Sequence, residues 1–234
     1  MTEPASDGWR EEDLHCWHVL SPLLLQGGYL PWTTGSMRPA GLVAVCNEIV
    51  HGARTQIVEC GSGVSTVLLA RLLRERRAGG LVALEHDPHW AGVVQDQLHR
   101  ESLDTIARVL HAPLDGQPPW YTLAGLHEVP DAIDLLIIDG PPAFDPGHGT
   151  RREPALPRFD ERLVDGATVI LDDIARPGER QVIASWEGST DWRFILDETT
   201  GVAIGRRRTR TLSLSRAPQQ RNPVFRTKLL GTPA

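Results

Sequence analysis

Residues 56–66 read QIVECGSGVST, where an apolar run ends in an acid and is followed by two glycines. This order predicts a strand over 56–60, a tight turn, and a helix from Ser65 to Arg76. Because glycine has no Cβ, the backbone at Gly61 and Gly63 can approach a ligand closely. The N-terminus of the helix offers unpaired N–H groups and a positive dipole end. The turn therefore predicts a binding site for a ligand with an anionic end.

A second acid, Glu85, closes the next predicted strand, residues 81–86. It follows Gly61 by 24 residues (85 − 61), and in nucleotide-binding βαβ units an acid about 20 residues after the glycine turn holds the ribose hydroxyls. Turn and acid together indicate a cofactor that carries a ribose. Thr66 stands where a dinucleotide fingerprint has its third glycine, and the turn has no lysine of the kind that a phosphate-binding loop requires.

Length and charge restrict the class of protein. The chain has 234 residues, enough for one α/β domain, and a net charge of −6, which argues against general nucleic-acid binding. No apolar run reaches the roughly 18 residues of a membrane span, and the acidic N-terminus does not resemble a secretory signal. Cys16, Cys46 and Cys60 lack metal-type spacing. We expect a cytoplasmic protein with reduced thiols and with no membrane or nucleic-acid partner.

Strand-like and helix-like segments alternate along the chain. Helices are expected at 15–25, 37–51, 65–76, 87–100, 158–165 and 178–186, and strands at 56–60, 81–86, 106–110, 133–139, 167–171, 192–196, 202–203 and 211–215. This order predicts a Rossmann-like α/β sandwich of three layers, with a mostly parallel sheet and an antiparallel end. Its expected parts are a disordered N-terminus (1–13), a helical cap (14–52), a cofactor-binding core (53–216) and a C-terminal tail (217–234).

Acids stand at the ends of four of the predicted strands. They are Glu59, Glu85, Asp139 and the pair Asp172 and Asp173. In an open parallel sheet, ligands bind beyond the carboxyl ends of the strands. We therefore expect these side chains to face one crevice.

Four pieces of the chain, in this order, resemble class I S-adenosylmethionine-dependent methyltransferases. They are VECGSG (58–63), LEHDP (84–88), IIDGPP (137–142) and VILDD (169–173). The resemblance covers about residues 40–215. It implies a seven-stranded sheet with an antiparallel last strand, and S-adenosylmethionine as the cofactor.

The resemblance also assigns cofactor contacts residue by residue. It places the methionine moiety at Glu59, Gly61 and Gly63, its carboxylate at Ser65 or Thr66, and the ribose at Glu85. It places the adenine near Ala112 and Pro113, the transferable methyl near Asp139, and an N-terminal contact at Ser36 and Met37. His86, which follows Glu85, either contacts the adenosine or faces solvent. Trp120 and Tyr121 either flank the adenine or belong to the core.

Asp139, Asp172 and Asp173 resemble the metal triad of catechol O-methyltransferase-like and some sugar O-methyltransferases. The resemblance implies Mg²⁺, a hard cation that prefers carboxylate oxygens and can activate a substrate hydroxyl. The catechol enzymes have a lysine base after the first acid, whereas this chain has GPPAF at 140–144. His148, in the following loop, is our candidate base. Arg151 and Arg152 either hold an anionic substrate or lie in solvent.

These features predict an O-methyltransferase that uses S-adenosylmethionine, and Mg²⁺, to methylate a hydroxyl of a small molecule. Three alternatives stay open. One is a metal-independent methyltransferase acting on nitrogen or a carboxylate, the second is a dinucleotide-binding protein, and the third is a fold without chemistry. The apolar N-terminal helices could also pair two copies into a homodimer.

Overall fold

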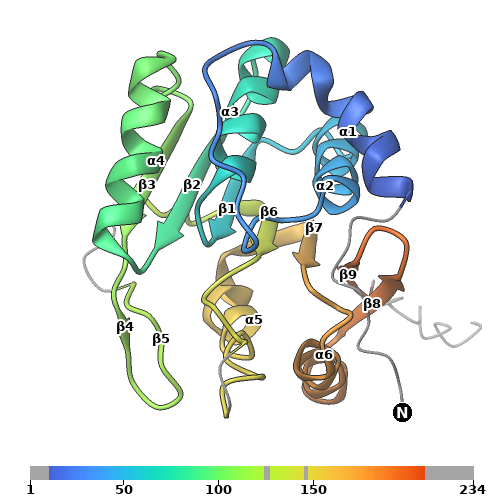
Figure 1. Cartoon of the computed structure of the whole chain (residues 1–234). Helices are drawn as coiled ribbons and strands as arrows, with labels where there is room; N and C mark the ends of the chain where they lie inside the picture. Colours follow the sequence, from blue (N-terminus) through green and yellow to red (C-terminus); the bar gives the residue numbers. More distant parts are fainter. Residues whose placement is uncertain (1–10, 124–126, 145–146, 209–234) are drawn as a thin grey trace, which may run out of the picture.

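The computed structural model describes residues 11–123, 127–144 and 147–208, which build a twisted sheet with helices on both faces (Figure 1). From one edge to the other, the strands are β3 (Ala107–His111), β2 (Gly80–Glu85), β1 (Gln56–Cys60), β6 (Ile133–Ile138), β7 (Leu163–Leu171), β9 (Val202–Arg207) and β8 (Trp192–Asp197). The pairs from β3 to β7 are parallel, and β9 runs antiparallel to both of its neighbours. The predicted seven-stranded sheet with a reversed last strand is confirmed.

Two apolar cores, one on each face of the sheet, give the three layers. On one face lie α1 (Glu11–Leu24), α2 (Pro39–His51), α3 (Val64–Arg76) and α4 (Pro88–Arg100); on the other lie α5 (Ala155–Phe159), the 3₁₀ turn η1 (Asp160–Arg162) and α6 (Pro177–Ser189). A short hairpin, β4 (Leu114–Asp115) with β5 (Trp120–Tyr121), joins the second face. The strand residues alternate between the two cores: Ile57 and Leu135 face the first, and Val58 and Leu136 the second. Burial on both faces explains the near-continuous apolar runs in the sequence.

The structure corrects three boundaries. The predicted disordered segment 1–13 is too long, because residues 11–13 form the first turn of α1 and Asp13 is buried. The helix predicted at 158–165 is instead α5 and η1, which end by Arg162, since Leu163 already pairs with Ile133 in the sheet. The reversed strand is β9, longer than the predicted 202–203. The strand predicted at 211–215 lies outside the described residues.

A buried arginine connects the end of α1 to α3. Arg71 of α3 is fully buried and donates hydrogen bonds to the carbonyls of Leu23 (2.8 Å) and Gly28 (3.2 Å), and it pairs with Glu101 (2.6 Å). The chain that leaves α1 is thereby held against α3, and from there it passes across the carboxyl ends of the strands. Within the described residues, no helix is both long and apolar enough to cross a membrane.

Candidate active site

The glycine turn between β1 and α3 forms the floor of the site. Gly61 has φ +96°, which favours glycine, and a Cβ there would lie 3.3 Å from the backbone nitrogen of Gly140. Gly140 is equally confined, because a Cβ on it would press on Gly61 and on the Tyr121 hydroxyl. The turns after β1 and β6 can therefore lie this close together only because each has a glycine at the point of contact.

Glu59 stabilises the turn through hydrogen bonds to the start of α3. It is fully buried, and its two carboxylate oxygens accept hydrogen bonds from Ser65 Oγ (2.5 Å) and Thr66 Oγ1 (2.6 Å). Thr66 Oγ1 in turn accepts from the backbone nitrogen of Gly63 (3.0 Å). Burial raises the pKa of Glu59 to about 7. Both acceptor oxygens of Glu59 are thus occupied by the helix that follows the turn.

Glu85, at the end of β2, faces the turn from the side. Its Oε2 accepts from the backbone nitrogen and the hydroxyl of Ser62 (both 3.1 Å), and its Oε1 accepts from the backbone nitrogen of Asp87 (3.0 Å). Oε1 also lies 2.8 Å from Nδ1 of His86. Burial opposes the charge, but these contacts outweigh it and hold the pKa of Glu85 below its usual value; the same pair raises the pKa of His86. Glu85 is therefore a fixed carboxylate.

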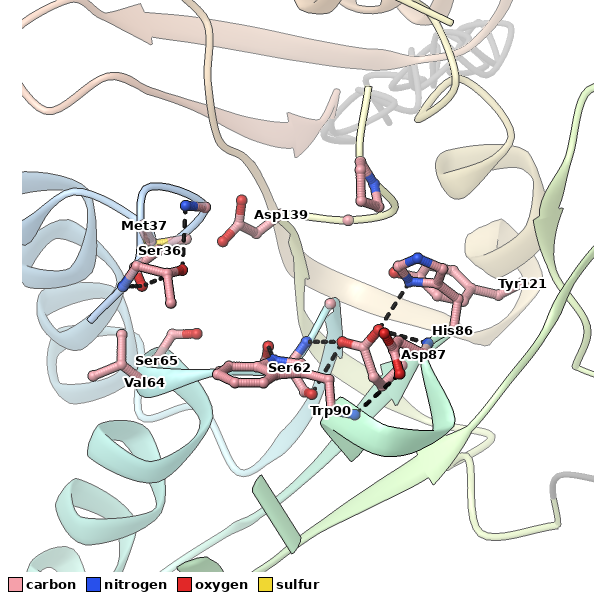
Figure 2. A pocket seen from close by; sticks show the side chains of 17 residues that line it. Ser36, Met37, Ser62, Val64, Ser65, His86, Asp87, Trp90, Tyr121 and Asp139 are labelled. Atoms are coloured by element: carbon pink, nitrogen blue, oxygen red, sulfur yellow. Dashed lines mark hydrogen bonds and ion pairs between the residues drawn. The ribbon is translucent and has the colours of Figure 1, made fainter. Parts of the chain in front are cut away.

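A pocket opens above the turn, and Figure 2 shows its side chains. It is lined by Thr33, Gly35, Ser36, Met37, Gly61, Ser62, Gly63, Val64, Ser65, Glu85, His86, Asp87, Trp90, Tyr121, Asp139, Gly140 and Pro142. The pocket thus brings together the loop before α2, the glycine turn and the ends of β2 and β6. Of the predicted cofactor residues, those that line the pocket are Ser36, Met37, Gly61, Gly63, Ser65, Glu85, His86 and Asp139. Those that do not line it are Glu59, Thr66, Ala112 and Pro113.

Two aromatic residues line the pocket: Trp90 was not predicted, and Tyr121 was expected either beside the adenine or in the core. Trp90 in the first turn of α4 donates from Nε1 to the carbonyl of Ser62 (2.8 Å) and so fixes the outer rim of the turn. Tyr121 on β5 is almost fully buried, and its hydroxyl has no hydrogen-bond partner within the described ranges. Burial raises the pKa of Tyr121 well above its ordinary value, so the hydroxyl stays a donor. Tyr121 therefore presents an unused donor to the pocket.

The three predicted metal ligands do come together. One oxygen from each of Asp139, Asp172 and Asp173 lies within 4.8 Å of the others, in the region where β6 and β7 end side by side. Burial and the neighbouring Asp172 raise the pKa of Asp139 well above its ordinary value. Only Asp139 of the three lines the pocket, and its carboxylate points into the cavity (Figure 2).

Arg152 lies among these acids, and this was not foreseen. The sequence left it either to substrate binding or to solvent, but only 2% of its surface is exposed. Its Nη2 lies 3.0 Å from Asp173 Oδ2 and 3.5 Å from Asp139 Oδ1, and its Nη1 lies 3.4 Å from Oε1 of Glu179. A guanidinium group thus already supplies positive charge to the cluster that was expected to hold a metal ion.

Comparison with known proteins identifies the family. A family model described as a methyltransferase domain matches residues 58–174, half of the chain. The chain belongs to this family. The matched range of this methyltransferase runs from β1 past the acid pair at the end of β7, and so includes the glycine turn, Glu85 and Asp139. No curated protein matches the chain in sequence.

Solved structures agree on the fold. A methyltransferase from Podospora anserina with S-adenosylhomocysteine bound is 12% identical, with a TM-score of 0.58 over 86% of this chain and 89% of its own. A candidate O-methyltransferase from Klebsiella pneumoniae is 19% identical (TM-score 0.57, 86% and 98%), and a candidate caffeoyl-CoA O-methyltransferase from Staphylococcus aureus is 12% identical (TM-score 0.55, 83% and 99%). The predicted class I S-adenosylmethionine-dependent methyltransferase is confirmed in family and in fold.

The structure does not bring the predicted base of this methyltransferase to the pocket. His148 is absent from the pocket lining, and its Nδ1 is buried without a hydrogen-bond partner in the described ranges. Its loop instead contacts α6, where Gly149 lies against Gly178 so closely that a Cβ on Gly178 would overlap it. Of the three aspartates at the ends of β6 and β7, Asp139 is the one whose side chain lines the pocket.

Proposed function

We propose that this methyltransferase transfers the methyl group of S-adenosylmethionine to a hydroxyl of a small molecule. The observation that carries the proposal is Glu85, a nearly buried carboxylate fixed beside the glycine turn and facing the pocket. A carboxylate in this place of a βαβ unit accepts hydrogen bonds from the two hydroxyls of a ribose. The likeness to two candidate O-methyltransferases supports oxygen as the methyl acceptor.

The rest of the pocket suits the other parts of this cofactor. Gly63 caps the N-terminus of α3, where unpaired N–H groups and the helix dipole favour the methionine carboxylate. Ser65 adds a hydroxyl on the same turn, and Ser36 and Met37 close the pocket from the loop before α2. His86 lies beside Glu85 on the adenosine side of the proposed cofactor.

Asp139 is the residue that we propose accepts the proton of the substrate hydroxyl. Its side chain points into the pocket, and Arg152, 3.5 Å away, favours its ionised form. Once it is ionised, the raised pKa of Asp139 makes its carboxylate a stronger base than an exposed aspartate. In the reaction, the substrate oxygen forms a bond to the methyl carbon as the carbon–sulfur bond breaks. The proton passes to Asp139, and S-adenosylhomocysteine leaves. For this displacement, the pocket must hold the substrate oxygen, the methyl carbon and the cofactor sulfur in line.

The magnesium prediction fits the structure poorly. The donor oxygens are of the right type, but a guanidinium group lies 3.0 Å from Asp173 and 3.5 Å from Asp139. Mg²⁺ requires oxygen ligands at about 2.0–2.1 Å and would share these two carboxylates with a fixed positive charge. No step of the proposed reaction therefore runs through a metal ion.

Calorimetry with S-adenosylhomocysteine tests the cofactor part of the proposal. We expect the wild-type protein to bind it and Glu85→Gln to bind it about 10- to 100-fold more weakly, because hydrogen bonds to a charged group contribute roughly 1.5–3 kcal/mol. Asp96→Asn, which changes an exposed acid of α4 in the same way, should bind like the wild type. Tight NAD binding without S-adenosylhomocysteine binding would establish a dinucleotide-binding protein instead.

The acceptor is tested by mass spectrometry of hydroxylated small molecules incubated with the enzyme and methyl-labelled S-adenosylmethionine. We expect the label on an oxygen atom. Label that appears on nitrogen or on a carboxylate would replace the hydroxyl part of the proposal. A protein that binds cofactor but labels nothing across hydroxyl, amine and carboxyl pools would support a fold without chemistry.

A further inference from the structure

We propose that the guanidinium of Arg152 takes the place of a divalent cation among the acids, so that this methyltransferase binds no metal there. The inference rests on the proposed function for its catalytic consequence, since it leaves Asp139 facing the pocket without a metal.

Hydrogen bonds to three backbone carbonyls hold the guanidinium of Arg152 in place. Nη2 donates to the carbonyl of Asp139 (2.6 Å), Nη1 to the carbonyl of Asp172 (3.3 Å) and Nε to the carbonyl of Pro141 (3.4 Å). These carbonyls belong to the segments that follow β6 and β7, so the guanidinium joins the two strand ends. Withdrawal would leave buried carbonyls without their donors, which costs free energy.

Acidic side chains surround the same guanidinium. Besides Asp139 and Asp173, Arg152 faces Glu179 of α6, which is fully buried and whose two oxygens have no hydrogen-bond partner in the described part of the chain. A buried carboxylate without such partners depends on nearby positive charge. Arg152 therefore offsets the negative charge of Glu179 whenever this side chain is ionised, and Glu179 is not one of the three possible metal ligands.

Two of the three possible metal ligands, Asp139 and Asp173, already have an oxygen close to a guanidinium group. Asp173 Oδ2 lies 3.0 Å from Arg152 and 2.7 Å from Arg176, so two guanidinium groups share one oxygen. A divalent cation at the triad would be repelled by both groups, and Arg152 is held in place by the carbonyls of two strand ends. The cluster contains four carboxylates, those of Asp139, Asp172, Asp173 and Glu179, and two guanidinium groups, those of Arg152 and Arg176. Its formal charge is therefore −2 (4 − 2 = 2 excess negative charges) when all the acids are ionised. Direct measurement of metal binding is therefore the decisive experiment.

The experiment titrates Mn²⁺, a paramagnetic substitute for Mg²⁺, into the full-length protein with and without S-adenosylhomocysteine, and follows free Mn²⁺ by electron paramagnetic resonance. We expect the wild type to leave the free-ion signal unchanged, and we expect activity to be the same with and without a chelator. Stoichiometric Mn²⁺ binding that Asp172→Asn abolishes would overturn the proposal, as would loss of activity in the chelator that Mg²⁺ restores.

Two variants test whether Mn²⁺ binding depends on where a positive charge lies in the cluster or only on how many positive charges it has. Arg152→Gln removes the central guanidinium, and we expect it to gain Mn²⁺ binding. Arg176→Gln removes the same charge from the edge of the cluster, where the arginine is more exposed, and should gain none. Binding gained equally by both variants, or by neither when both are folded by circular dichroism, would contradict the assigned role of Arg152.

If Arg152→Gln does not fold, Arg152→Lys and the wild type still decide the question. The lysine keeps a positive charge, and we expect it to bind no Mn²⁺; binding by this variant or by the wild type would overturn the proposal. Binding of S-adenosylhomocysteine is measured on the same samples. A wild type that binds neither ligand would refute the proposed function but not the inference about the metal.

Discussion

The hydroxyl of Tyr121 is a hydrogen-bond donor that no group in the described residues accepts. Its hydroxyl lines the pocket, is buried and lacks a partner in the described ranges, so an acceptor on a bound ligand would satisfy it. We expect Tyr121→Phe to weaken S-adenosylhomocysteine binding by about 2- to 10-fold, the equivalent of one neutral hydrogen bond at roughly 0.5–1.5 kcal/mol. The melting temperature without ligand should stay the same or rise, because an unpaired buried hydroxyl is removed.

The chain's other tyrosine provides the control for this prediction. Tyr29 is 86% exposed and does not line the pocket, so Tyr29→Phe should leave calorimetric affinity unchanged. Unchanged affinity in Tyr121→Phe would mean that Tyr121 only packs against Gly140 and Trp120.

The sequence predicts those side chains of the pocket whose positions are fixed by the local geometry of the chain. Gly61, Gly63 and Glu85 are in the pocket because a strand, a turn and a helix start place them there, whatever else surrounds them. Glu59 was expected at the cofactor, yet its oxygens accept from α3 because Ser65 and Thr66 begin that helix. Arg152 had no local signal, since its partners come from β6, β7 and α6.

At the scale of elements, α1 and α2 are coupled by one buried carboxylate. Asp13 of α1 accepts from the backbone nitrogen of Ala40 in the first turn of α2 (3.2 Å), and from Nε and Nη2 of Arg38 (3.0 and 2.7 Å). Arg38 follows Met37, which lines the pocket. We expect Asp13→Asn to lower the free energy of unfolding by about 1–3 kcal/mol, because a buried ion pair loses its negative partner.

Hydrogen exchange locates the effect of Asp13→Asn. Amides of α1 and of residues 33–38 should exchange faster, and S-adenosylhomocysteine affinity should fall with them, whereas the β-sheet amides should change least. Glu12→Gln, one residue earlier and exposed, should behave like the wild type. Faster exchange spread evenly over the sheet would show that Asp13 stabilises the whole fold and does not specifically hold the cap.

Element boundaries were predictable where periodicity continues and not where tertiary pairing decides. The helix α3 and the strands β1 and β2 match their predictions closely, because both patterns are unbroken. Residues 140–157 contain several prolines and show no hydrophobic periodicity. The short helix α5, which begins near the end of this segment, is set by the packing of Leu156 and Phe159 into the core. The pairing of β9 between β7 and β8 depends on contacts across the sheet, which no local pattern records.

At the scale of the whole molecule, the parallel order of the sheet gathers acids at one edge and then buries them. Glu59 and Glu179 are both fully buried, and burial raises the pKa of each to about 7. Arg152 opposes this rise for Glu179, and the hydroxyls of Ser65 and Thr66 oppose it for Glu59. The sequence predicted that acids would cluster, but the extent of their burial follows from the layers above and below the sheet.

The buried acids predict how stability depends on pH. Between the ordinary glutamate pKa of 4.5 and about 7, the native protein keeps protons on Glu59 and Glu179 that the unfolded chain has released. The free energy of unfolding should therefore fall as pH rises through this window, by up to about 1.4 kcal/mol per pH unit for each group. The raised pKa values of Asp139 and Asp172 act in the same direction. Glu48 and Glu101 have lowered pKa values and act oppositely below pH 4.5, so maximum stability is expected near pH 5.

Urea denaturation at a series of pH values between 4 and 8 measures this dependence. In Glu59→Gln the side chain at position 59 no longer titrates, so the stability of this variant should fall less steeply between pH 5 and 7 than that of the wild type. Relative to the wild type, its affinity for S-adenosylhomocysteine should change less than that of Glu85→Gln, because Glu59 does not line the pocket. Glu12→Gln should reproduce the wild-type slope, since this side chain is exposed. Parallel slopes for the wild type and Glu59→Gln would show that Glu59 is ionised in the native protein throughout the range, and that its hydrogen bonds from Ser65 and Thr66 outweigh the cost of its burial.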